Sequence, residues 1–125
     1  MHAPPPIPEL ERLVMEEIWG QGEATVRSVR DALNAEASQP ERAYTTVLTI
    51  LQRLDAKGLV ARHRNGKTDV YSAALPREEY LGARADAEVS ELLDHYGELA
   101  LVQFARRMAA LDPERRAALQ RLARE

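Results

Sequence analysis

Three threonines and a glutamine recur at helical spacing between residues 45 and 52. At 100° per residue, Thr45, Thr49 and Gln52 share one face of a helix, and Thr46 and Arg53 flank it. Hydroxyl and amide groups on short side chains hydrogen-bond to base edges, and threonine methyl groups contact the methyl group of thymine. Because threonine is a mediocre helix former, three within five positions are poorly explained as ordinary exposed residues. The pattern favours a helix that reads base pairs.

The opposite face of this segment is apolar. Its apolar residues fall within about 100° of one another, the width of a stripe buried against a core. Gly58 follows as a C-terminal stop, so we expect a helix over residues 43–57. The predicted buried residues are Val47, Ile50, Leu51 and Leu54.

The sequence offers no catalytic or metal-binding constellation. It has no cysteine, and its three histidines are His2, His63 and His95. Neither His63 nor His95 has a serine or carboxylate at a spacing that would nominate it for catalysis, and there is no glycine-rich phosphate loop. We therefore expect a protein that is not an enzyme and has neither a cofactor nor a metal site.

Basic residues are concentrated in one part of the chain. Residues 42–68 hold six Lys or Arg and one carboxylate, a net charge of +5, whereas residues 1–41 carry −5 and residues 69–125 carry −3. A charged segment is often only a solvated face, but a positive segment between acidic flanks is typical of a polyanion site. The net charge of the whole chain, −3, should weaken indiscriminate DNA binding.

Length and composition are those of a folded protein that does not cross a membrane. The chain has 125 residues, of which 45% are hydrophobic and 30% charged, and no apolar run approaches the length of a membrane span. The N-terminus lacks the basic flank and apolar stretch of a secretion signal. We expect a cytoplasmic, nucleoid-associated protein whose proline-rich residues 1–7 are disordered.

In the sequence, two further helices precede the helix expected over residues 43–57, and a hairpin follows it. Helical spacing of apolar residues begins at Pro8, and Thr25 is a suitable N-cap for a second helix. Two β-branched runs over residues 59–64 and 67–72 are separated by Asn65-Gly66, a strong two-residue hairpin signal. Three helices followed by a hairpin make a winged helix, which we place at residues 8–75.

The hairpin and the start of the third helix carry further candidate DNA contacts. Basic side chains on the hairpin would grip phosphate beside the groove that the third helix enters. The residues expected to contact DNA are Arg42, Tyr44, Thr45, Thr46, Thr49, Gln52, Arg53, Arg64 and Lys67.

Residues 76–125 read as a helical segment for dimerisation. Their apolar arc is wider than one helix needs to pack on a single surface, so we expect a second copy of the chain to bury it. The alternative is that these helices fold back on their own winged helix. Gly97 breaks the helical pattern of this segment, and Asp112-Pro113 marks the start of a last helix. The residues expected at the dimer contact are Leu92, Leu101, Phe104, Met108, Leu119 and Leu122.

Several of these segments resemble the BlaI/MecI-type penicillinase repressors. The segments are residues 10–19 (LERLVMEEIW), 22–27 (GEATVR), 43–54 (AYTTVLTILQRL), 57–60 (KGLV) and 77–80 (REEY). The resemblance covers residues 8–111, closely as far as residue 81. It implies a dimeric winged-helix repressor that occupies palindromic operators with TACA/TGTA-like half-sites. It also points to Thr45, Thr46, Thr49 and Arg53 as the operator contacts.

The chain departs from the family pattern in two places. The link over residues 37–42, with Pro40 inside it, is longer than usual, so we expect a bulged turn that alters the phosphate contacts of Arg42. Well-known members are inactivated when a sensor-linked protease cuts an Asn-Phe bond; the matching pair here is Gln103-Phe104. The cysteine-rich tail of a copper-responsive branch is missing, which argues against that mode of sensing.

Two other functions fit the same sequence. A one-component regulator would bind a small ligand between the winged helix and the C-terminal helices, and would lose operator affinity with its chain intact. A winged-helix adaptor would dock an acidic protein on the positive segment, and would bind duplex DNA weakly and without sequence preference.

Overall fold

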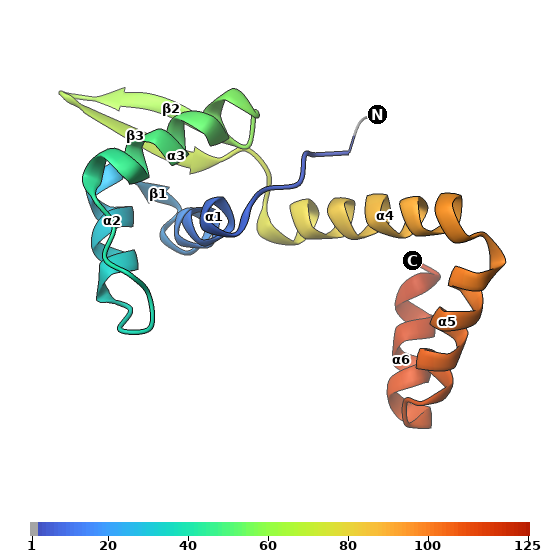
Figure 1. Cartoon of the computed structure of the whole chain (residues 1–125). Helices are drawn as coiled ribbons and strands as arrows, with labels where there is room; N and C mark the ends of the chain where they lie inside the picture. The colour runs from blue at the N-terminus through green and yellow to red at the C-terminus, as the bar shows by residue number, and fades with distance from the viewer. Residues whose placement is uncertain (1–2) are drawn as a thin grey trace. The chain divides into compact units, whose positions relative to one another are not determined.

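The computed structural model describes residues 3–125, which form six helices and a small sheet (Figure 1). Two compact units are present, one ending at Arg84 and the other comprising Ala85–Glu125. None of the helices formed by the described residues has the length and hydropathy that a membrane span requires. In chain order the elements are α1 (Glu9–Gln21), β1 (Glu23–Ala24), α2 (Val26–Ala35), α3 (Tyr44–Ala56), β2 (Val60–Asn65), β3 (Thr68–Ala73), α4 (Arg77–Tyr96), α5 (Glu98–Ala109) and α6 (Pro113–Ala123).

The first helices begin and end where local signals place them. Thr25 caps α2 as expected: its hydroxyl accepts the Ser28 N–H at 3.0 Å, and the Ser28 hydroxyl accepts the Thr25 N–H at 2.9 Å. This reciprocal capping box satisfies two backbone donors that a helix start leaves without partners. α3 covers Tyr44–Ala56, within one residue of the predicted bounds at each end.

The core of the first unit lies where α1, α2 and α3 meet the sheet. All four residues of the predicted α3 stripe are buried, and Val47, Leu51 and Leu54 have no exposed surface. Val14 and Ile18 from α1 and the inward face of α2 belong to the same cluster. The predicted buried face of α3 is therefore confirmed.

The sheet has three antiparallel strands in the order β1-β3-β2, and β2 and β3 form the hairpin. β1 has two residues, too few for a sequence pattern to predict it. Asn65 pairs with Thr68, so Gly66 and Lys67 form the two-residue turn, and Gly66 has φ +66°. The prediction of an Asn65-Gly66 turn was one residue early.

The observed register has an electrostatic reason. An Asn65-Gly66 turn would place Arg64 opposite Lys67, whereas the observed register places it opposite Asp69. Like charges directly opposite each other destabilise a strand pair, and opposite charges stabilise it. The Arg64 Nη1 to Asp69 Oδ1 distance of 3.0 Å shows that the favourable pair forms.

The first turns of α4 belong to the winged-helix unit. Trp19 Nε1 donates to the Leu75 carbonyl at 2.9 Å, and its ring centroid lies 5.6 Å from that of Tyr80. Arg77 Nε lies 2.9 Å from Glu16 Oε2. The first compact unit consequently extends to Arg84, beyond the predicted boundary at residue 75.

Part of the proline-rich N-terminal segment is held against α4. The Pro5 carbonyl accepts the Tyr80 hydroxyl at 2.8 Å, the Pro4 carbonyl accepts Arg84 Nη1 at 3.1 Å, and Ile7 packs on the core. These contacts differ from the disorder expected for residues 1–7, because Tyr80 and Arg84 supply partners that composition does not indicate. Residues 1 and 2 lie outside the described part of the chain.

The second unit contains the rest of α4 together with α5 and α6. Gly97, with φ +57°, separates α4 from α5, and the Asp112 side chain accepts the Arg115 N–H at 2.9 Å to start α6. Both breaks were predicted. α5 and α6 lie side by side (Figure 1), and Ala100 is the one buried residue in the described Ala85–Glu125 unit.

Candidate nucleic-acid interface

The polar face of α3 is open to solvent, opposite its buried stripe. Thr45, Thr46, Thr49, Gln52 and Arg53 are all exposed. All but Gln52 line a shallow hollow of about 300 Å³, whose wall is completed by Leu10 of α1 and by Ile50. The structure therefore brings four of the predicted reading residues to one surface.

Thr49 uses its hydroxyl within the helix. Its Oγ1 donates to the Thr45 carbonyl oxygen at 2.9 Å, the usual back-bond of a helical threonine. This bond occupies the hydroxyl proton but leaves oxygen lone pairs as acceptors and leaves the methyl group for apolar contact. In this state Thr49 is suited to accept from an exocyclic amine or to touch a thymine methyl group.

Asn34 fixes the chain just before α3. Its Nδ2 donates to the Arg42 carbonyl at 3.0 Å, and its Oδ1 accepts the Arg42 N–H at 2.7 Å. The side-chain amide thus pairs with both backbone groups of one residue of the link. The longer link expected over residues 37–42 is therefore tied to α2 at its end, and Arg42 is half-buried.

The positive segment is less uniform than its sequence suggests. Lys57 Nζ lies 2.6 Å from Glu11 Oε2, and Arg62 and Arg64 lie 4.0 and 3.0 Å from the Asp69 carboxylate. Asp69 falls one residue beyond the segment 42–68, so counting charge within that segment overlooked it. Lys67 and Arg53 have no ion-pair partner among the described residues.

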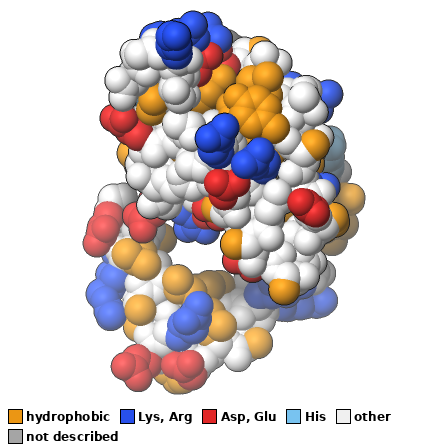
Figure 2. Space-filling view, turned by 90° about the vertical axis from the view of Figure 1, so that its left-hand side faces the viewer, with side chains coloured by type: hydrophobic (Ala, Val, Ile, Leu, Met, Phe, Trp, Pro, Cys, Tyr) orange, Lys and Arg blue, Asp and Glu red, His pale blue; other side chains and the backbone are white. Residues whose placement is uncertain are grey.

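The candidate phosphate contacts on the wing, which is the β2–β3 hairpin, therefore differ from one another. Lys67 lies in the exposed turn, whereas Arg64 is exposed but paired with Asp69. Figure 2 shows Lys and Arg side chains grouped at its top, where the hairpin lies. Tyr44, at the start of α3, is 44% exposed. The contacts of Arg64, Lys67 and Tyr44 with DNA stay predictions.

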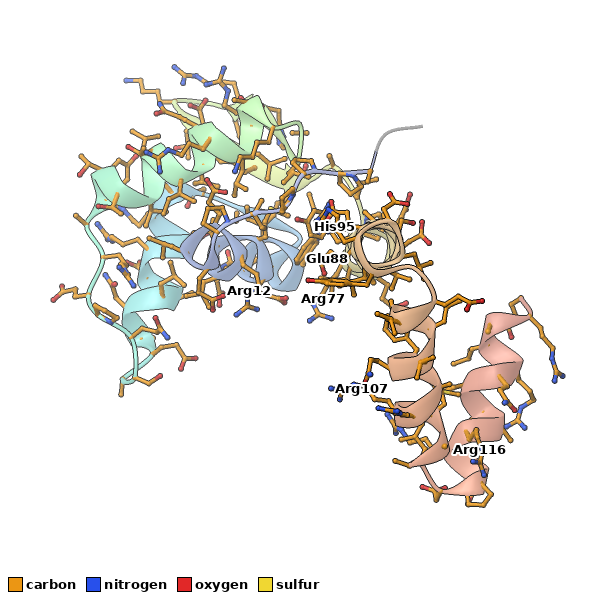
Figure 3. The ribbon with its side chains drawn as sticks, turned by 45° about the vertical axis from the view of Figure 1, so that its right-hand side comes forward. Arg12, Arg77, Glu88, His95, Arg107 and Arg116 are labelled. Atoms are coloured by element: carbon orange, nitrogen blue, oxygen red, sulfur yellow. The ribbon has the colours of Figure 1, made fainter. Side chains whose placement is uncertain are left out.

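The candidate dimer residues occupy different surroundings in the second unit. Leu92 and Phe104 line one apolar groove of about 460 Å³ together with Tyr96 and Leu99. Arg107 also lines this groove, and Figure 3 shows it projecting from α5 on the side away from α6. Leu101 and Leu122 are exposed, at 52% and 61%, and Met108 and Leu119 are half-buried.

The candidate cleavage pair lies inside a helix. Gln103 and Phe104 are in the middle of α5, where their backbone is hydrogen-bonded in helical turns. A protease acts on a chain that has opened locally, so cutting here requires part of α5 to unfold first.

The histidines are not arranged for catalysis. His63 Nε2 lies 3.9 Å from Glu23 Oε2 on the exposed side of the sheet, and the His95 ring meets the Tyr96 ring edge-on with centroids 6.2 Å apart. Within residues 3–125, no group of three or more His, Asp or Glu side chains could hold a metal ion.

A family model and a relative with a sequence identity above 30% point to the same family. The family model described as penicillinase repressor matches residues 7–125. The transcriptional regulator BlaI of Mycobacterium tuberculosis is 39% identical over 104 residues, which are 82% of this chain and 73% of that protein. The family and this relative are regulators of transcription, not enzymes.

Two solved structures support the same assignment. The DNA-binding domain of the repressor BlaI is 28% identical and matches with a TM-score of 0.52 over 64% of this chain and 94% of that one. The Bacillus licheniformis BlaI monomeric form, solved in complex with the blaP half-operator, matches with a TM-score of 0.51 at the same identity and coverage. The protein therefore belongs to the penicillinase repressor family and is a BlaI-type transcriptional repressor with a winged-helix DNA-binding domain.

Proposed function

We propose that this repressor works as a homodimer on a palindromic operator, with α3 in the major groove and the wing beside it. The observation that carries the proposal is the outer face of α3, where hydroxyl, amide and guanidinium groups are exposed opposite a fully buried stripe. The major groove admits one α-helix and is the groove in which all four base pairs differ. The Bacillus licheniformis BlaI relative was solved in complex with a half-operator, which supports operator DNA as the partner.

Dimerisation through the second unit is supported by its exposed apolar side chains. Tyr96, Leu99 and Leu101 are 60%, 70% and 52% exposed, and the groove beside Leu92 is almost wholly apolar. A contiguous apolar surface on a helical unit marks a site of association. A second copy would bring two α3 helices to the two halves of one operator, and the two-fold axis would match a palindrome.

Release from DNA follows, in this proposal, from proteolysis of α5 between Gln103 and Phe104 by a sensor-linked protease. Cutting there would separate Leu92, Tyr96 and Leu99 from Phe104, which lines the same groove, and would thereby separate the two copies. Each winged helix would then bind its half-site alone and far more weakly. Gln103→Asn introduces the residue that the family has at this bond, so we expect the protease to cut this variant faster than the unmodified chain. Mass spectrometry of the fragments measures the cutting. If the variant and the unmodified chain are equally stable in the presence of the active protease, release at this bond is contradicted.

Fluorescence anisotropy with two duplexes tests the DNA-binding part of the proposal. A labelled TACA/TGTA palindrome should bind ~10³-fold more tightly than a scrambled duplex of equal length, across a salt series. Thr49→Ala should cost about 1–3 kcal/mol on the palindrome and little on the scrambled duplex. Ser90→Ala is the control, because it removes an exposed hydroxyl from α4 instead of α3.

Lys67→Ala separates phosphate contact from base reading. It should weaken both duplexes by the same factor and reduce the salt dependence by about one unit of slope. Equal losses on both duplexes for Thr49→Ala would remove the assignment of the reading face. Weak binding of the unmodified chain to both duplexes would favour the adaptor instead.

Sedimentation tests the dimer. Leu99→Glu places a charge on a side chain that is 70% exposed, so the fold of one chain is kept while association is opposed. We expect the unmodified chain to sediment as a dimer and the variant as a monomer that keeps its affinity for a half-site duplex. Glu98→Gln is the neighbouring control. A monomeric unmodified chain would contradict the proposal.

A ligand-responsive regulator is the second candidate, favoured by the 460 Å³ apolar groove lined by Leu92, Tyr96 and Phe104. Pockets of this volume and apolar character suit small molecules. An apolar compound that lowers operator affinity while the chain stays intact would favour this mechanism over proteolysis.

A further inference from the structure

A second hollow of the winged-helix unit lies between the start of α2, the start of α3 and the wing. It has a volume of about 440 Å³, and its polar lining includes Arg27 from α2, Tyr44 from α3 and Lys67, Thr68 and Asp69 from the wing. Arg27 lies in the acidic segment of residues 1–41 and is not among the predicted DNA contacts. Packing alone brings it to the wing.

The two cations of this hollow are uncommitted. Arg27 and Lys67 are both exposed, and within the described part of the chain neither makes a side-chain hydrogen bond or an ion pair. By contrast, Arg12, Arg30, Lys57 and Arg77 each have a carboxylate partner. The hollow thus holds cationic groups that are free to bind an anion.

The one carboxylate of the hollow does not neutralise them. The Asp69 oxygens lie 3.0 Å from Arg64 Nη1 and 4.0 Å from Arg62 Nη1, so this charge is already compensated within the hairpin. The exposed Tyr44 and Thr68 supply hydroxyl donors beside Arg27 and Lys67. Two cations and two hydroxyls around one hollow suit an anion with several acceptor oxygens, such as a phosphate group.

The proposed DNA binding supplies that anion at this place. When α3 occupies the major groove and the wing lies beside it, one sugar–phosphate strand must pass between the two elements, because a backbone strand separates adjacent grooves. The hollow lined by Tyr44 and Lys67 lies between α3 and the wing. We propose that it holds a backbone phosphate of the bound DNA, contacted by Arg27 and Lys67. The inference rests on the DNA binding proposed above.

The assignment gives Arg27 a definite task. A phosphate contact fixes the orientation of the protein on the duplex and carries no sequence information itself. Because Arg27 stands on α2 and Lys67 on the wing, one phosphate would connect these elements on either side of α3. Binding through Arg27 therefore adds the same affinity on every sequence.

Anisotropy with the same two duplexes tests this site. Arg27→Ala should weaken the palindrome and the scrambled duplex by the same factor, about tenfold, and lower the salt slope by about 0.9 for the lost phosphate contact. Arg27→Lys should recover part of the loss, since the charge is kept. Arg30→Ala is the matched control, because Arg30 lies one turn along α2 and is paired with Asp31 at 2.9 Å.

The outcomes separate this inference from the proposed function. An unchanged affinity and salt slope for Arg27→Ala, with the unmodified chain binding its duplex, would overturn the phosphate site alone. A loss confined to the palindrome would also overturn it, because Arg27 would then act on sequence reading. Failure of the unmodified chain to bind either duplex would overturn both.

Two further measurements keep the result interpretable. Thermal unfolding of Arg27→Ala should match that of the unmodified chain, since an exposed, unpaired side chain contributes little to stability. Saturating inorganic phosphate should shift the amide resonances of Arg27 and Lys67 far less than duplex DNA does. Tight binding of inorganic phosphate alone would identify a site for a free anion and would overturn the assignment to the DNA backbone.

Discussion

Lys57 Nζ lies 2.6 Å from Oε2 of Glu11 and thereby joins the end of α3 to the first turn of α1. Glu11 is 4% exposed, and it is the one charged residue that is buried in the described part of the chain. A carboxylate removed from water requires a partner. The ion pair therefore compensates Glu11 and holds the C-terminal end of α3 to the core.

Lys57→Met should destabilise the protein, because it leaves the Glu11 carboxylate buried without its cation. We expect a loss of about 1–3 kcal/mol in the free energy of unfolding, measured by urea denaturation. Lys67→Met, which removes an exposed and unpaired lysine, should cost less than about 0.5 kcal/mol. A loss no greater than this control would show that the pair does not stabilise the fold. The double variant Glu11→Leu with Lys57→Met should regain stability over Lys57→Met alone.

Asn34→Ala should loosen the link into α3, because both backbone groups of Arg42 lose their partner. The Arg42 amide should then exchange its hydrogen faster, and affinity for the palindrome should fall with a stability loss of about 1–3 kcal/mol. Asn34→Asp keeps an acceptor for the Arg42 N–H but loses the donor, so its exchange rate should be intermediate. Unchanged exchange at Arg42 in Asn34→Ala would contradict the positioning role.

Gly66→Ala should destabilise the wing for conformational reasons. Gly66 has φ +66°, which costs an L-residue about 1–2 kcal/mol, although no atom within 4 Å would obstruct the added methyl group. Gly20→Ala is the matched control, because Gly20 lies in α1 with equally open surroundings and alanine is the better helix former there. The control should gain about 0.5–1 kcal/mol. Urea denaturation measures both, and equal signs would contradict the interpretation of the turn.

Tyr71 should make the fold sensitive to alkali. Burial raises the pKa of the Tyr71 phenol above its ordinary value of 10.0, and the Asp69 carboxylate raises this pKa further. Above pH 10 the unfolded chain loses this proton while the folded chain keeps it, so stability falls as pH rises from there. Tyr71→Phe should flatten that fall in thermal unfolding between pH 9 and about 11. Tyr96→Phe, at an exposed position, is the control, and equal slopes in all three chains would refute the link.

The polar and buried faces of α3 could be predicted because their evidence is local. The helical period of 3.6 residues places Val47, Leu51 and Leu54 on one face and Thr45 and Thr49 on the other. This placement does not depend on the rest of the chain. The cap at Thr25 and the breaks at Gly97 and Asp112 are equally local signals. In these cases backbone chemistry within a few residues decides the outcome, and the structure confirms each element.

The wing was predicted in outline, but its turn was displaced by one residue. Asn65-Gly66 is a strong local signal, yet pairing Arg64 with Asp69 across the strands favours the turn at Gly66 and Lys67. The local turn preference and the cross-strand charge pairing favour different turns here, and the observed turn is the one that pairs the opposite charges. The same pairing is invisible to a count of charges along the chain, because the favourable partner lay just outside the segment counted.

The sequence by itself determined the three helices, the hairpin, the two faces of α3 and the resemblance to the repressor family, since each depends on residues close together in the chain. The tertiary structure alone decided which charges are free. Glu11 and Lys57 are 46 positions apart, and Arg27 and Lys67 are separate in sequence but line one hollow. These contacts depend on how the helices and the sheet pack, because burial of the common core decides which elements come together. Side-chain periodicity within one element does not decide it.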